Sequence, residues 1–146
     1  MIMSPLKLIY SNLYNDFKKR GNEEKARING TIISTILIFL LLFAGFLLLI
    51  IYYPDFEQKS TNFLVRLFDD KLVIKGISKM FLIASFGIIY ILVKYTIGTE
   101  ASYNKIIEEF YLLPPEQQKG IKKRATPYFM TPIILFVVTM ILLMNK

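Results

Sequence analysis

The chain has 146 residues, of which 54% are hydrophobic and 20% are charged, and its formal net charge is +7 at pH 7. It contains no histidine, cysteine or tryptophan, which excludes imidazole bases, thiolate nucleophiles, cysteine-held metals and disulfides. This length suits one domain, and the apolar share exceeds that of typical soluble domains, so we expect a single membrane domain over residues 1–146.

The first segment, residues 4–20, has the pattern of an amphipathic helix. Ser4 and Pro5 suit a helix start, and one face then carries apolar residues at helical spacing, from Leu6 to Phe17. We expect this helix to lie on the inner membrane surface with its apolar face among the acyl chains. A helix docked on a partner subunit is the alternative. The basic last turn provides three candidate contacts to lipid headgroups, which are Lys18, Lys19 and Arg20.

The strongest membrane signal is the 27 uncharged residues of 28–54. About 20 apolar residues already cross the ~30 Å hydrocarbon core of a bilayer, so we predict a first span over 28–53. Glu23 and Glu24 suit the start of a helix that leads directly into this span. Gly30 and Ser34 form a pair of small residues one turn apart near its beginning.

The loop after the first span predicts an outer-face helix over residues 59–70. Its apolar side chains recur at helical spacing, while Arg66 and Asp69 belong to a polar side. Such a helix would rest on lipid, and docking of an extracytoplasmic partner is the alternative.

The second predicted span, residues 72–98, is weaker, because only the 14 residues of 80–93 form its uncharged centre. Lysines near its ends can extend their ammonium groups to the interface, so a full crossing is feasible and a re-entrant helix is the alternative. Gly76, Ala84 and Gly87 lie along one stripe. Small residues allow helices to approach closely, so we interpret these as helix-packing residues and expect this span to be central.

Residues 100–124 predict inner-face helices that form a hairpin beneath the membrane and touch the N-terminal helix. Thr99 or Ser102 is positioned to cap the first helix, and the connection is too long to lack structure. Three basic residues at the end of this segment are further candidate headgroup contacts, namely Lys122, Lys123 and Arg124. A third span follows over 125–144, which holds 20 uncharged residues, and we expect Pro132 in its first turn or at a kink.

The distribution of Lys and Arg predicts the orientation. Six lie in residues 1–27 and six in 94–124, whereas the five in 55–79 are balanced by four acids. We therefore expect the N-terminus in the cytoplasm and the C-terminus outside. Richness in Lys, Ile and Asn indicates an AT-rich, bacterial genome, and therefore a multi-pass protein of the bacterial cytoplasmic (inner) membrane.

The sequence therefore predicts an all-α integral membrane protein with three transmembrane helices plus amphipathic interfacial helices. Adjacent acids such as Glu108 and Glu109 point about 100° apart on a helix, and the first and third spans lack ionisable groups. We expect no catalytic, cofactor-binding or metal-binding residues.

The leading hypothesis is a non-enzymatic accessory, assembly or scaffold subunit of a larger membrane protein complex. Its expected partners are membrane lipids and other integral membrane subunits, with a possible homo-oligomer and no nucleic acid. One alternative is an oligomeric pore or transport component, or a membrane-acting toxin, holin or immunity protein. Another is a lipid-handling enzyme with an interfacial site.

Overall fold

The computed structural model describes residues 3–53, 55, 58–59, 62 and 71–145, and for Glu24 and residues 71–79 it describes the backbone alone. Six helices and no strand make up this described part of the chain. The expected all-helical class is therefore confirmed. Most of the predicted outer-face helix, 59–70, lies outside the described residues.

Two helical stretches are long and apolar enough to cross a membrane, Lys25–Tyr52 and Pro115–Met144. A third crossing is formed only if Met80–Thr96 and Glu100–Tyr111, which are bent by 63° at the break between them, count as one span. The described part of the chain is thus helical and has two or three candidate membrane spans.

The first span belongs to α2 (Glu24–Tyr52), which begins at the second residue of the acidic pair, with Glu23 as its N-cap, and continues without a break. Its last turn closes when the Tyr53 N–H donates to the Leu49 carbonyl over 2.9 Å. Pro54, the next residue in the sequence, has no N–H with which to continue the ladder. The helix that leads directly into the span is therefore observed.

The last helix, α7 (Ile121–Met144), begins earlier than the predicted span, and both Pro127 and Pro132 lie inside it. Of the two places expected for Pro132, the first turn is wrong, because the helix already starts at Ile121, next to the basic residues, and Pro132 lies in its interior. Each proline removes one backbone N–H from the ladder without ending the helix. The basic residues and the apolar span therefore share one continuous helix.

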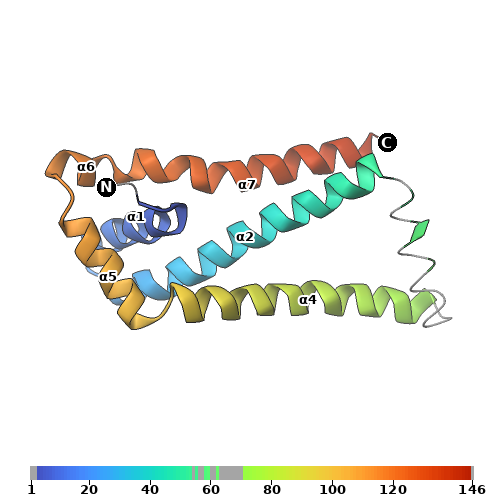
Figure 1. The fold of residues 1–146 in the computed structure, drawn as a ribbon, viewed down its shortest axis with the longest axis horizontal. Coiled ribbons are helices and arrows are strands. Elements are labelled where there is room, and N and C mark those ends of the chain that lie inside the picture. The colour runs from blue at the N-terminus through green and yellow to red at the C-terminus, as the bar shows by residue number, and fades with distance from the viewer. Residues whose placement is uncertain (1–2, 54, 56–57, 60–61, 63–70, 146) are drawn as a thin grey trace.

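Helix α2 is the central span of the described structure, since it packs against α1 (Pro5–Lys19), α4 (Lys71–Thr96) and α7. Figure 1 shows α2 running between α7 and α4 and diverging from α4 away from their shared end. The expectation that the second predicted span is central is wrong. Small residues of α2 are buried and allow other helices to pack closely against it. The small residue Ala84 of α4, by contrast, is exposed.

Helix α1 is enclosed by the rest of the chain. Residues 8–14 are all buried, which amounts to about two complete turns, and α1 packs against α2, α5 and α7. The expectation that its apolar face lies among acyl chains is wrong. That face packs instead against the other helices of the same chain, where Tyr10 and Tyr14 share one buried cluster with residues such as Phe110 of α5.

The segment 100–124, predicted to lie on the inner face, forms α5 (Glu100–Tyr111), the short α6 (Pro115–Lys119) and the start of α7. The Thr99 hydroxyl accepts a hydrogen bond from the Ser102 N–H over 3.2 Å, so the Thr99 cap is confirmed. The expected contact between α5 and α1 is also confirmed. We call α1, α5, α6 and the adjoining ends of α2, α4 and α7 the head; the C-terminus lies at the opposite end of the molecule (Figure 1).

Candidate functional site

The head is built around Tyr10, whose side chain is completely buried. A Cβ placed on Gly30 of α2 would lie 2.7 Å from the Tyr10 ring, so only glycine leaves room for this contact. The Tyr10 hydroxyl lies 2.9 Å from the Thr31 hydroxyl. Because Thr31 donates its own proton to the Arg27 carbonyl, Tyr10 is the donor of the bond to Thr31.

Glycine at position 98, in the turn between α4 and α5, allows a second close approach to α2. A Cβ placed there would lie 2.6 Å from the Thr31 hydroxyl oxygen. The carbonyl of Gly98 also accepts a hydrogen bond of 3.5 Å from the Arg27 guanidinium. The α4–α5 turn and α1 therefore meet α2 at neighbouring residues, which fixes the geometry of the head.

A salt bridge joins α1 to α5. The Lys7 ammonium lies 2.8 and 2.7 Å from the two carboxylate oxygens of Glu109, which is buried. Its neighbour Glu108 is exposed. The two adjacent acids therefore diverge, as helical geometry predicts, and Glu109 is part of the helix packing.

A chain of polar contacts joins the ends of α1 and α5. The hydroxyls of Tyr14 and Tyr111 lie 2.8 Å apart, and Lys18 donates a hydrogen bond to the Tyr111 hydroxyl while its ammonium lies 4.8 Å from the centre of that ring. The bond from Lys18, with a further bond from Tyr14, holds the pKa of Tyr111 below its ordinary value. Burial, assisted by the bond to Tyr111, raises the pKa of Tyr14.

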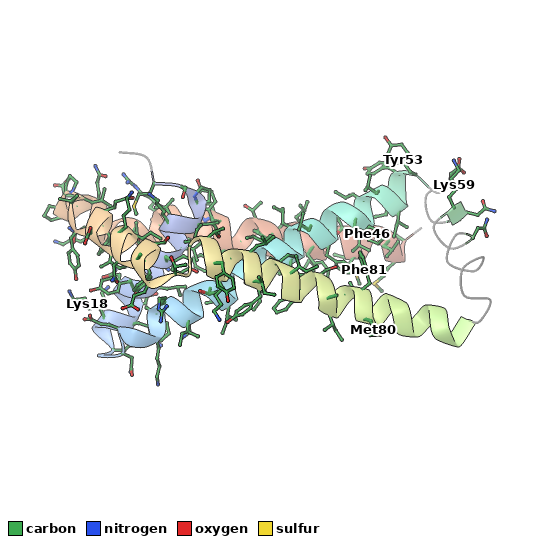
Figure 2. The ribbon with its side chains drawn as sticks, turned by 60° about the horizontal axis from the view of Figure 1, so that its bottom comes forward. Lys18, Phe46, Tyr53, Lys59, Met80 and Phe81 are labelled. Atoms are coloured by element: carbon green, nitrogen blue, oxygen red, sulfur yellow. The ribbon has the colours of Figure 1, made fainter. Side chains whose placement is uncertain are left out.

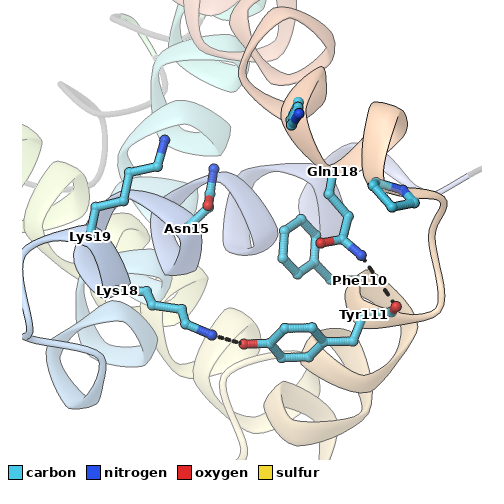
Figure 3. Close-up of a pocket in the computed structure, with 8 residues that line it drawn as sticks. Asn15, Lys18, Lys19, Phe110, Tyr111 and Gln118 are labelled. Atoms are coloured by element: carbon cyan, nitrogen blue, oxygen red, sulfur yellow. Dashed lines mark hydrogen bonds between the residues drawn. The ribbon is translucent and has the colours of Figure 1, made fainter.

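Beside this chain of contacts lies an open pocket with a volume of about 280 Å³. It is formed by the last turns of α1 and α5 together with α6 (Figure 3). Its lining residues are Asn15, Lys18, Lys19, Phe110, Tyr111, Pro115, Gln118 and Lys119. Three of these carry a positive charge and none is acidic, so the pocket favours an anion.

The predicted headgroup contacts all lie in the head. Lys18 and Lys19 line the pocket, while Arg20 is exposed at the end of α1. Lys122, Lys123 and Arg124 are exposed on the first turn of α7, and Arg124 donates a hydrogen bond of 3.3 Å to the Gln117 side chain. The structure thus brings both basic segments to one end of the molecule.

Lys18 and Lys19 are the only pocket residues that the sequence singled out as contacts; the other six are Asn15, Phe110, Tyr111, Pro115, Gln118 and Lys119. Lys119 was visible only as the first residue of a basic run that continues to Arg124. Asn15 and Gln118 carry no pattern of their own. The Gln118 amide joins α6 to the end of α5, since it donates to the Leu113 carbonyl over 2.8 Å.

Two of the predicted packing residues of α4 face open space. Ala84 is exposed, and a Cβ placed on Gly87 would meet nothing within 4 Å. At Gly76 the structure describes the backbone alone. Helix packing through Ala84 and Gly87 therefore requires a surface other than those that the described residues of this chain provide.

Acidic side chains do not gather into a metal site in the described ranges: no group of three or more His, Cys, Asp or Glu residues occurs there. The site that the structure offers is therefore the lysine-lined pocket of the head, together with the exposed surface of α4. Comparison of the chain with known protein families, curated proteins and solved structures gives no match.

Proposed function

We propose that this protein is a non-enzymatic accessory or scaffold subunit of a membrane protein complex, and that α4 is the helix that binds another integral membrane subunit. The proposed location is the bacterial cytoplasmic membrane, with the N-terminus and the α5–α6 segment in the cytoplasm. One observation supports the proposal most directly, namely the exposure of most apolar side chains of α4 between Met80 and Leu92.

Helix α4 has exposed side chains on several sides. Met80, Phe81 and Ile83 are 71%, 71% and 73% exposed, and Figure 2 shows Met80 and Phe81 at a distance from the head, where Lys18 lies. Lipid can cover large apolar side chains. Small residues such as Ala84 and Gly87, by contrast, contribute most to packing when the backbone of another helix approaches them. A partner helix would therefore use the side of α4 that carries the small residues.

The head supports a scaffolding role because it holds the spans without help from a partner. Tyr10, Thr31 and Gly98 connect α1, α2 and the start of α5 through the close contacts described above. The two segments rich in Lys and Arg lie at this same end (Figure 1). A shared basic end is what the positive-inside rule requires of cytoplasmic segments, which favours the proposed orientation.

Photo-crosslinking in native membranes tests the proposal. A photoreactive residue is placed at Ala84 or Gly87, and in a matched variant at Leu42 of α2, which is 60% exposed. We expect a discrete crosslinked protein from α4 and only diffuse lipid adducts from Leu42. Mass spectrometry of the product identifies either another subunit or a second copy of this chain.

The proposal fails if α4 yields no discrete product and mild detergent releases a monodisperse monomer with no co-purifying protein. As a second measurement, Ala84→Leu and Gly87→Leu should weaken recovery of the partner. Leu42→Ala should not change it. Equal recovery in all three variants would contradict a role for the small residues of α4.

A further inference from the structure

The lysine-lined pocket collects positive charge from two segments that are far apart in the sequence. Lys18 and Lys19 come from the last turn of α1, and Lys119 ends α6. Figure 3 shows Lys18 and Lys19 on α1, with Gln118 and Tyr111 across the pocket. Like charges repel, so this arrangement is favourable only when an anion or solvent compensates them.

The ammonium groups of this pocket remain available to a ligand. Among the residues that the structure describes, the ammonium groups of Lys19 and Lys119 form no salt bridge and no hydrogen bond. Lys18 uses one donor on the Tyr111 hydroxyl, and an ammonium group has three donors. By contrast, the nearby cation Lys7 is already paired with Glu109.

The shape of the pocket limits the size of the ligand. Its volume of about 280 Å³ lies below the ~300–1,000 Å³ of sites that enclose drug-sized molecules. Phe110 and Pro115 contribute apolar surface, and the Tyr111 hydroxyl holds the Lys18 ammonium by a hydrogen bond. Lysine binds phosphate oxygens as a concentrated point charge, so a single phosphate group suits both the charge and the size.

We propose that this pocket binds a phosphate group, either as the free anion or as part of the headgroup of an anionic lipid. The inference goes beyond the scaffold function and does not rest on it, because the pocket belongs to the head and the partner surface belongs to α4. A negative result of the crosslinking experiment would therefore not contradict the proposed phosphate site.

The test compares two double variants of the full-length protein. Lys19→Gln with Lys119→Gln removes two charges from the pocket. Lys25→Gln with Lys105→Gln removes two charges from exposed positions of α2 and α5 that do not line it. In one arm, inorganic phosphate is titrated calorimetrically into protein in a phosphate-free detergent. In the other, nanodiscs of phosphatidylcholine with or without phosphatidylglycerol are analysed by native mass spectrometry for retained lipid.

We expect the pocket variant to lose about 30-fold in affinity, since each lysine near an anionic phosphate contributes about 1 kcal/mol. The control variant should retain most of the affinity. Binding of inorganic phosphate supports the free anion as ligand. Retention of phosphatidylglycerol without binding of inorganic phosphate supports the lipid headgroup.

Two results would overturn the proposal: no binding in either arm, or equal losses in the two double variants. Circular dichroism establishes that both variants are folded. If the pocket double variant fails to fold, the single variants Lys19→Gln and Lys119→Gln replace it. Each should show about half of the loss of affinity, on a logarithmic scale, that is expected of the double variant. An unchanged affinity in both single variants would contradict the site.

Discussion

The head and the described part of α4 that lies away from it are organised in opposite ways. In the head, α1 is buried on all sides over residues 8–14. Along α4, neighbouring side chains such as Met80 and Phe81 are exposed. The head therefore holds its geometry through contacts within the chain, whereas this part of α4 depends on what surrounds it.

The contrast follows from the side chains that each region carries, and it agrees with α4 lying in a bilayer. Polar groups in the head need partners once they are buried, and tyrosine hydroxyls, Thr31 and the Lys7–Glu109 pair supply them. Within a bilayer there is no hydrophobic force to bring apolar helices together. In a bilayer, apolar side chains such as Met80 and Phe81 of α4 would be covered by lipid, so α4 could diverge from α2 at little cost.

The largest expected effect comes from removing the centre of the head. Tyr10→Ala should destabilise the protein by about 3–5 kcal/mol, as large-to-small changes at buried aromatic positions do. Phe81→Ala on α4 should cost less than about 0.5 kcal/mol, because the side chain is 71% exposed. Equilibrium unfolding in mixed micelles measures both. Tyr10→Phe, which removes only the bond to Thr31, should cost about 1 kcal/mol, and similar losses at Tyr10 and Phe81 would contradict the contrast.

A smaller effect is expected from adding one methyl group to each region. Gly30→Ala should destabilise the head by about 1–3 kcal/mol, because the new Cβ would overlap the Tyr10 ring. Gly87→Ala meets open space and should be neutral or stabilising by up to about 1 kcal/mol through helix propensity. The same unfolding assay distinguishes the two variants. A harmless alanine at position 30 would show that α1 is not packed as described.

The smallest effect concerns the Tyr103 hydroxyl, which is buried without a hydrogen-bond partner in the described structure. Burial raises the pKa of Tyr103 to about 12 from the ordinary 10.0. Because the folded pKa is the higher one, the stability contributed by the neutral phenol is complete below pH 10 and is lost as the pH rises to about 12.

Tyr103→Phe should therefore leave stability at neutral pH unchanged or slightly higher, since no hydrogen bond is removed. It should also reduce the loss of stability in the alkaline range. Unfolding midpoints measured from neutral pH to pH 12 test both points, with phenolate absorbance as a second readout. An identical alkaline loss in the variant would show that Tyr103 is not responsible for it.

Local chemistry made much of the fold predictable. The helix that runs from the acidic pair into the first span, the Thr99 cap and the end of α1 before Gly21, whose φ is +68°, all follow from interactions within a few residues. The pattern of α1 likewise predicted one apolar face. It did not predict what covers that face, because periodicity reports which side chains avoid water and not which surface replaces the water.

The sequence by itself therefore determined that the chain is helical, where its most apolar segments lie and that two segments are basic. The tertiary structure alone decided that α1 is enclosed by its own chain, that α2 and not α4 is central, and that Lys19 and Lys119 line one pocket. These features depend on close approaches between residues far apart in the chain, such as Tyr10 on Gly30. Whether two such surfaces fit is a property of shape in three dimensions, which the spacing of residues along one chain does not contain.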